Sequence, residues 1–307
     1  MYLPDFLIGT GGWAYFKVPN KTSLKAYSEL FNFVEVNNTF YHYPTFQTVR
    51  RWREIVPNNF TFSVRCHHDL THKIGFIPSS QAFEIFYQMR QYCDILNSPY
   101  LVLETPATYL INKKNEKETR DFFSSLSING LRLVWEIRAP ITQTVVGIME
   151  DFGIIHCVDL SKQKPSFDLD VTYSRLFGKG QHNLYQFNDD ELTEIDRKAQ
   201  NTDSKTVILS YHGARMNSDA ARFKHYKRTG NFLPVTAFIG IDSAEAVLSE
   251  DAVFPTSKAI LIAEQGWKIF DVSPDRRAHL AEVLDKIPNR PYSDLGEVIK
   301  ELRRFFD

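Results

Sequence analysis

The chain has 307 residues, of which 43% are hydrophobic, so it can form a large core and does not have the composition of a disordered protein. Its formal net charge of −1 argues against a protein that coats nucleic acid through phosphate contacts, because such proteins are usually basic. Its three cysteines form no C-x-x-C pair, which argues against a disulfide framework and a thiolate metal site. There is no leader-like start and no apolar run of about 18–20 residues, so we expect a cytoplasmic protein with no membrane partner.

Short apolar segments alternate with amphipathic ones along most of the chain. The expected strands are residues 6–12, 33–41, 60–67, 100–105, 131–138, 154–159, 171–177 and 206–212. The expected helices are residues 24–31, 47–55, 81–96, 116–126, 142–150, 189–200 and 218–226, with an irregular connection through Pro165. This alternation predicts an α/β fold with a parallel sheet, and eight strands fit a TIM-type (β/α)8 barrel over residues 1–230.

The last part of the chain, residues 231–307, breaks this rhythm. Helical patterns remain at residues 243–249, 276–284 and 295–305. We therefore expect a C-terminal helical elaboration that packs on the barrel, with the whole chain forming a single domain.

Charged residues recur near the ends of the expected strands. Side chains alternate between the two faces of a strand, and the outward face of a barrel strand packs on helices and must be apolar. The polar face should therefore point into the barrel. Nine charged or histidine side chains fall on that face: Glu35, Arg65, His67, Glu104, Glu136, Arg138, Asp159, Arg175 and His212.

Most of this inward set lies late in its strands, at the C-terminal mouth where barrel active sites form. Burying so many charges is costly unless they pair with one another or bind a ligand. A structural ion-pair network that fills the barrel is the alternative, and each single residue is more easily explained as structural than as catalytic. The argument for a site rests on the whole set.

Several motifs resemble those of the YecE-like family, a large group of uncharacterised TIM-barrel proteins with a domain of unknown function. They are Ile8-Gly9-Thr10-Gly11-Gly12-Trp13-Ala14-Tyr15, Val34-Glu35-Val36-Asn37-Asn38-Thr39-Phe40-Tyr41, Thr48-Val49-Arg50-Arg51-Trp52, Thr71-His72, Trp135-Glu136-Ile137-Arg138 and Tyr173-Ser174-Arg175-Leu176-Phe177-Gly178. The resemblance implies the barrel fold but no established activity. The chain departs from the family pattern at Glu104-Thr105-Pro106 and Tyr211-His212-Gly213, as a divergent subgroup would.

A metal site is one option for this mouth. Glu35, Glu104, Glu136, Asp159 and His212 offer oxygen and imidazole ligands for a divalent metal, although three arginines on the same face would oppose a cation. His68 and His72 are spaced like zinc ligands on a helix, but the motif lacks the usual glutamate and the segment leaves a strand. His67 or His72 could serve as a ligand or a base, and a hydrogen-bonded loop histidine is the simpler interpretation. No metal ligand is assigned.

An anion site is the other option. Arg65, Arg138 and Arg175 can each hold a phosphate or carboxylate in a bidentate manner. Gly178, Lys179 and Gly180 follow the seventh strand, where barrels often bind phosphate, although a simple glycine turn explains them equally well. Asn37, Tyr41, Glu104, Asp159 and Trp13 are expected to line the same pocket.

These residues predict a hydrolase, or a related lyase, acting on a small phosphate-bearing ligand such as a nucleotide or a nucleic-acid fragment. Glu35 and Glu136 would form the acid/base pair, and His67 or His212 would carry the proton. The main alternative is a non-catalytic protein that binds an anion or a partner. A metal-dependent enzyme similar to sugar isomerases is a third possibility, and the arginines count against it.

Overall fold

A computed structural model describes residues 4–306. The described chain divides into two compact units. The first runs up to Leu176 and includes Lys198–Tyr211, whereas the second comprises Phe177–Arg197 and the chain from His212 onward. The expected boundary near residue 230 stays a prediction.

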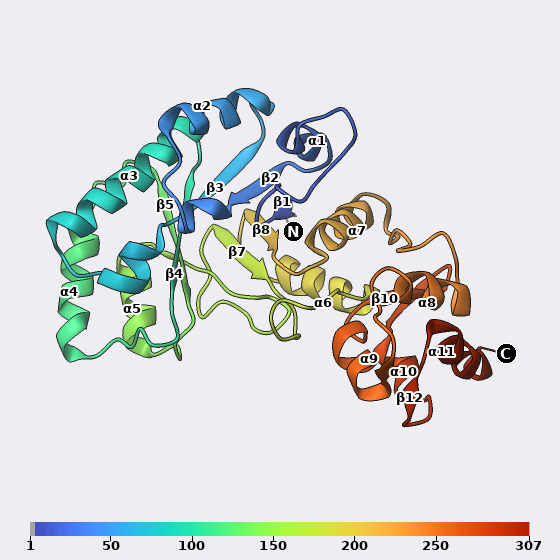
Figure 1. Ribbon diagram of the computed structural model, residues 1–307. Helices are drawn as coiled ribbons and strands as arrows, with labels where there is room; N and C mark the ends of the chain where they lie inside the picture. The colour runs from blue at the N-terminus through green and yellow to red at the C-terminus, as the bar shows by residue number, and fades with distance from the viewer. Residues whose placement is uncertain (1–3, 307) are drawn as a thin grey trace. The chain divides into compact units, whose positions relative to one another are not determined.

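The first unit contains eight parallel strands in a nearly closed TIM-type barrel (Figure 1). The strands are β1 (Asp5–Thr10), β2 (Phe33–Val36), β3 (Thr61–Arg65), β4 (Tyr100–Thr105), β5 (Arg132–Ile137), β6 (Ile155–His156), β7 (Val171–Leu176) and β8 (Thr206–Tyr211). Neighbours pair in the order β6-β5-β4-β3-β2-β1-β8-β7. A parallel bridge between Val158 and Ser174 joins the two ends of this sheet, so the predicted barrel is confirmed.

Helices alternate with these strands, as predicted. They are α1 (Ser23–Leu30), α2 (Phe46–Ile55), α3 (Ser80–Leu96), α4 (Lys113–Ser124) and α5 (Gln143–Asp151). Thr45, Ser79 and Thr142 precede three of them and accept a hydrogen bond from the backbone N–H three residues on. These N-caps satisfy amides that the helix itself leaves unpaired, and so fix where each helix begins.

The barrel interior changes character along its length. Its buried apolar cluster comprises Phe33, Tyr100, Val102, Val134, Ile155, Cys157, Val171, Tyr173 and Ile208. The next inward positions toward the strand ends, two residues further on in four of these strands, are Glu35, Glu104, Glu136 and Arg175. Apolar packing therefore fills the body of the barrel, and charge begins where the strands end.

β1 and β2 approach each other closely at Gly9. A Cβ atom built on Gly9 would lie 1.9 Å from the Phe33 carbonyl oxygen, so no larger residue fits without moving the strands. Tyr27 of α1 reaches the same point: its hydroxyl accepts from the Thr10 N–H at 2.8 Å and donates to the Phe33 carbonyl at 2.9 Å. The hydroxyl thus joins the two strands.

The second and third expected strands end earlier in the structure than predicted. Residues 37–40 form a 3-10 helix, η1 (Asn37–Phe40), instead of continuing β2. β3 ends at Arg65, because the β3–β4 pairing stops there, and a π-helix, η2 (Asp69–Ile74), follows shortly after. Strand alternation therefore does not determine where the side chains of Asn37, Thr39, Phe40 and His67 point.

The fifth to eighth strands are also shorter than expected. Arg138 follows β5, Asp159 lies beyond β6 and the Val158 bridge, and His212 follows β8. Strand alternation does not determine where these three side chains point.

The second unit begins with Phe177 and contains α6 (Asp189–Gln200) up to Arg197, followed after β8 by α7 (Met216–Thr229). It continues with α8 (Gly240–Leu248), β9 (Thr256–Ser257), α9 (Lys258–Gln265), β10 (Ile269–Ser273), β11 (Arg276–His279), α10 (Ala281–Leu284), β12 (Pro291–Tyr292) and α11 (Leu295–Leu302). Ala244, Leu248, Phe270, Leu284 and Val298 belong to its own buried core. None of the described helices is long and apolar enough to cross a membrane.

The helix expected over residues 276–284 was wrong in its first half. Arg276–His279 is a strand that pairs antiparallel with β10, and the short α10 covers the remainder. Alternating burial of polar residues on a hairpin explains the pattern: Arg277 is buried against Asp271, whereas Arg276 is exposed.

Candidate functional site

Six charged side chains of the first unit form one connected group at the C-terminal ends of the strands. This mouth cluster comprises Glu35, Arg65, Glu104, Glu136, Arg138 and Arg175. Three carboxylates face three guanidinium groups, so the cluster is balanced in formal charge. The sequence prediction that these residues converge is confirmed by their contacts.

Arg175 lies at the centre of the mouth cluster. Its Nη2 is 3.1 Å from Glu35 Oε1, and its Nη1 is 2.6 Å from Glu104 Oε2 and also contacts Glu136. Glu35 is fully buried and accepts a hydrogen bond from the Tyr173 hydroxyl at 2.9 Å. One guanidinium therefore connects carboxylates from three different strands.

Glu104 is the carboxylate shared by all three arginines. Besides Arg175, it contacts Arg65 Nη2, and its Oε1 lies 3.1 Å from Arg138 Nη2. Burial alone would raise the pKa of Glu104, but the charges of Arg175, Arg65 and Arg138 outweigh it and hold that pKa below its ordinary value. Glu104 is thus ionised, and it compensates two buried cations.

The pKa values of the two buried arginines, Arg65 and Arg175, are shifted in opposite directions. Burial lowers the pKa of Arg65, and the neighbouring positive charge of Arg175 adds to this effect. Burial acts in the same direction on Arg175, but Glu136, Glu35 and Glu104 together raise its pKa well above the ordinary value. Arg175 is therefore a fixed charge, suited to positioning its carboxylate neighbours.

Glu136 and Arg138 are the members of the mouth cluster that reach solvent. Their side chains are 14% and 47% exposed, against 6% or less for the other four. Arg138 Nε lies 3.5 Å from Glu136 Oε1, which is the longest ion-pair distance in the cluster. This pair is therefore the accessible part of the mouth cluster.

Histidines and aromatic rings lie beside the mouth cluster. Phe40 lies under the Arg65 guanidinium at 3.6 Å, and the His72 ring packs edge-on against Phe40 at 5.1 Å. Burial lowers the pKa of His72, with Glu104 opposing this effect and Arg65 and Arg138 supporting it. His72 is therefore neutral at physiological pH and can accept or relay a proton.

His67 occupies a different position from the one expected. Its ring stacks between Tyr43, at 3.9 Å, and His68, at 4.5 Å, and its Nδ1 accepts from the Asp69 backbone N–H at 3.2 Å. It contacts its sequence neighbours in the loop after β3. Its catalytic role stays a prediction.

The remaining expected pocket residues of the first unit are dispersed. Asn37 Oδ1 accepts from Arg65 Nη1 at 2.5 Å and so belongs beside the mouth cluster. Tyr41 is 56% exposed, Trp13 packs edge-on against Trp52 at 5.3 Å, and Asp159 accepts from the Ser161 hydroxyl at 2.6 Å. Their place in a ligand site stays a prediction.

Sequence reasoning missed Tyr173 and Ser63 as parts of this arrangement. The Ser63 and Tyr173 hydroxyls are 2.7 Å apart, and the Tyr173 hydroxyl also donates a hydrogen bond to Glu35. Both residues share the inward face with a charged neighbour two positions later, namely Arg65 and Arg175. That alternation was the available signal.

The other expected site residues belong to the second unit. His212 stacks on Phe177 at 4.9 Å, and Lys179 Nζ lies 3.0 Å from Glu191 Oε1. Gly178 has a φ of +75°, and a Cβ atom there would lie 2.2 Å from the Tyr185 ring. A Cβ atom on Gly180 would lie 2.0 Å from the Leu184 carbonyl. Both glycines are thus required by local packing, and anion binding by this loop stays a prediction.

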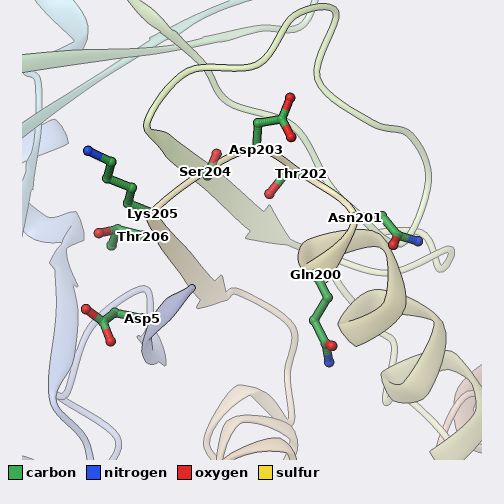
Figure 2. Close-up of a pocket in the computed structure, with 8 residues that line it drawn as sticks. All are labelled: Asp5, Gln200, Asn201, Thr202, Asp203, Ser204, Lys205 and Thr206. Carbon is green, nitrogen blue, oxygen red and sulfur yellow. The ribbon is translucent and has the colours of Figure 1, made fainter. Parts of the chain in front are cut away.

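A polar hollow occurs at the opposite, N-terminal end of β1 and β8. It is lined by Asp5, Gln200, Asn201, Thr202, Asp203, Ser204, Lys205 and Thr206 (Figure 2). Several of these residues serve the fold: the Ser204 hydroxyl donates to the Leu169 carbonyl, and the Lys205 N–H donates to the Asp170 carbonyl. In barrels this end contributes to stability, whereas catalysis occurs at the other end.

A family model described as "Protein of unknown function DUF72" matches residues 7–229. The chain belongs to the DUF72 family. This confirms the resemblance seen in the motifs, because those motifs lie inside the matched region. The chain beyond residue 229 lies outside the family model.

Solved structures of DUF72 family proteins are similar to this chain. One from Thermotoga maritima is 18% identical, with a TM-score of 0.57, and the match covers 73% of this chain and 99% of that protein. Another from Enterococcus faecalis is 14% identical, with a TM-score of 0.55 and coverage of 75% and 99%. At such identities the likeness establishes the fold alone. No curated protein matches the sequence.

Proposed function

We propose that this DUF72 protein is a hydrolase, or a related lyase, that acts on a phosphate-bearing ligand such as a nucleotide or a nucleic-acid fragment. The observation that carries the proposal is that Glu136 and Arg138 reach solvent. The other four members of the mouth cluster, two carboxylates and two arginines, are buried beneath them. A structural network needs no exposed members, whereas a site needs at least one anchor and one proton-transfer group within reach of a ligand.

Arg138 is the proposed anchor. Its guanidinium is half exposed and forms the longest ion pair of the mouth cluster, so an incoming phosphate can replace Glu136 as its partner at small cost. A guanidinium also matches phosphate oxygens in a bidentate manner. Arg65 and Arg175 have a different role in the proposal, because their side chains are buried against Glu35 and Glu104.

Glu136 is the proposed acid/base group. When the phosphate takes over Arg138, Glu136 keeps its contact with Arg175, which holds its orientation. We assign the proton-carrier role to His72, whose pKa is lowered by burial and is also influenced by the charges of Glu104, Arg65 and Arg138. Glu35 positions Arg175 and does not contact the ligand.

The experiment combines ligand-induced stabilisation with product formation. The purified chain is incubated with a panel of nucleotides and short oligonucleotides, and both the melting temperature and the products are measured. We expect Arg138→Gln to abolish the ligand-induced shift, because the anchor is lost. We expect Glu136→Gln to keep the shift and lose turnover by a factor of about 100 or more.

Arg197→Gln is the matched control, since Arg197 is another exposed arginine paired with a carboxylate, Glu194. It should behave like the wild type. A shift that depends on Arg138 without any product would show the non-catalytic binding protein instead. Full turnover in Glu136→Gln would remove Glu136 from the mechanism.

A further inference from the structure

Three consecutive residues after β3 bring their ligand atoms together. His67, His68 and Asp69 each offer one nitrogen or oxygen, and these atoms lie within 4.8 Å of one another. We propose that this His–His–Asp cluster binds a divalent transition-metal ion, with Zn²⁺ as the representative, at a site separate from the mouth cluster. The proposal does not depend on the phosphate chemistry above.

The distances fit a small metal ion. His67 Nδ1 lies 3.4 Å from Asp69 Oδ2, and His68 Nδ1 lies 3.2 Å from Asp69 Oδ1. Two ligand atoms bonded to a tetrahedral zinc ion at about 2.0–2.1 Å are separated by about 3.3–3.4 Å. Each ring nitrogen therefore stands at about this spacing from one carboxylate oxygen, and the three ligand atoms, which lie within 4.8 Å of one another, would draw closer around an ion.

The tautomer of His67 supports a cation at this point. Its Nδ1 accepts from the Asp69 backbone N–H, so this nitrogen carries no proton and its lone pair is available to an ion that displaces this hydrogen bond. The ring also hydrogen-bonds to the Tyr41 backbone. Since Nδ1 is the acceptor, the donor is Nε2. Metal-binding histidines are commonly held in this way.

Two imidazole nitrogens beside a carboxylate form an electron-rich cluster, which a nearby cation stabilises. The structure already places one there: Lys73 Nζ lies 2.6 Å from Asp69 Oδ1. The Lys73 side chain is 66% exposed and therefore leaves the carboxylate at little cost. We infer that Lys73 occupies the metal's place in the metal-free chain and moves into solvent when the ion binds.

The surroundings provide both rigidity and access. Tyr43 stacks on His67, and His67 stacks on His68, so both imidazoles are held in nearly parallel planes. Asp69 begins the π-helix η2, a type of helical turn frequent at functional sites. The His68 and Asp69 side chains are partly exposed, which gives an ion a path from solvent and leaves a coordination position for water.

The test uses the full chain stripped with a chelator and titrated with zinc chloride against a chromophoric zinc chelator. We expect one ion per chain at this site. His68→Ala and Asp69→Asn should each weaken binding at least tenfold, because each removes a ligand. Lys73→Gln should tighten binding about two- to threefold, because it removes the competing cation.

His225→Ala is the matched control, since His225 is also a partly exposed histidine at a helical position. Its zinc affinity should equal that of the wild type. Zinc binding that survives both His68→Ala and Asp69→Asn would overturn the proposal, as would weaker binding in Lys73→Gln. A merely structural Asp69–Lys73 ion pair predicts no zinc binding at all in this assay.

Discussion

The two units of the chain both contain buried arginine–carboxylate networks, but the networks are built differently. In the second unit, Arg222 contacts Asp189 and donates to the Phe187 carbonyl at 2.6 Å. Arg277 contacts Asp271 at 2.9 Å and donates to the Pro274 carbonyl at 2.8 Å. In the mouth cluster of the first unit, the described contacts of Arg65 and Arg175 are with side chains.

This difference separates a structural network from a site. Arginines that donate to backbone carbonyls fix the course of the chain, and Asp271 adds to this by accepting from the Thr236 N–H at 2.8 Å. The mouth cluster instead holds side chains against side chains and ends in the exposed pair Glu136 and Arg138. Burial of charge is common to both units, and Asp189 is as accessible as Glu136, so the half-exposed Arg138 is what distinguishes the candidate site.

The largest expected effect tests whether Glu104 supports the mouth cluster. Glu104→Gln leaves Arg65 and Arg175 buried with too little negative charge, so we expect a loss of about 3–5 kcal/mol in the free energy of unfolding. Denaturant unfolding can be followed in a Trp267→Phe background, where the remaining tryptophans, Trp13, Trp52 and Trp135, all report on the first unit.

Glu136→Gln is the paired comparison, because Glu136 belongs to the same cluster but reaches solvent. We expect it to cost about 1 kcal/mol or less. Equal losses in the free energy of unfolding of the two variants would mean that solvent exposure does not separate structural members of the cluster from ligand-binding ones.

The second prediction concerns Asp219 in the second unit. Burial raises the pKa of Asp219 to about 7, although Arg222 opposes this. Between the ordinary value of 3.8 and about 7 the folded chain keeps a proton that the unfolded chain has released, so stability falls as pH rises across this interval. Asp219→Asn should remove a pH-dependent change on the order of 4 kcal/mol in urea unfolding. Parallel pH profiles for the two proteins would contradict the assignment.

The mouth cluster should respond to pH in the opposite sense. The pKa of Glu104 lies below its ordinary value of 4.5, so the unfolded chain takes up the proton first as pH falls. The contribution of Glu104 to the free energy of unfolding is therefore fully present above about pH 4.5. It is lost in more acidic solution, by at most about 1.4 kcal/mol per pH unit. In Glu104→Gln that acid-sensitive part should be missing, and an unchanged acid slope would show that Glu104 is not its source.

The smallest effect on stability is expected at Arg138. Because its side chain is half exposed, Arg138→Gln should change the free energy of unfolding by about 0.5 kcal/mol or less. The same variant should lose ligand-induced stabilisation completely. A large destabilisation without a ligand would place Arg138 with the structural members of the cluster.

Strand alternation was sufficient to predict the barrel and the inward face of Glu35, Arg65, Glu104, Glu136 and Arg175, because each lies within a paired strand. It did not predict that β2 and β3 end before Asn37 and His67, because strand ends depend on hydrogen bonds to neighbouring strands that are distant in sequence. Which carboxylate meets which guanidinium was equally inaccessible, since it depends on how far each strand is shifted along its neighbour. The His–His–Asp cluster could not be predicted from the sequence either, because it depends on the local turn geometry after β3.

The close approach at Gly9 bears on how the family's opening motif is understood. Its first glycine lies where β1 meets β2, and Tyr27, outside the motif, completes that contact through Thr10 and Phe33. The motif therefore records a steric requirement for pairing β1 with β2, and we expect other chains that carry it to share this contact whatever reaction they catalyse. Differences in chemistry among such chains should be sought at the residues that end the strands, where strand pairing does not dictate the side chain.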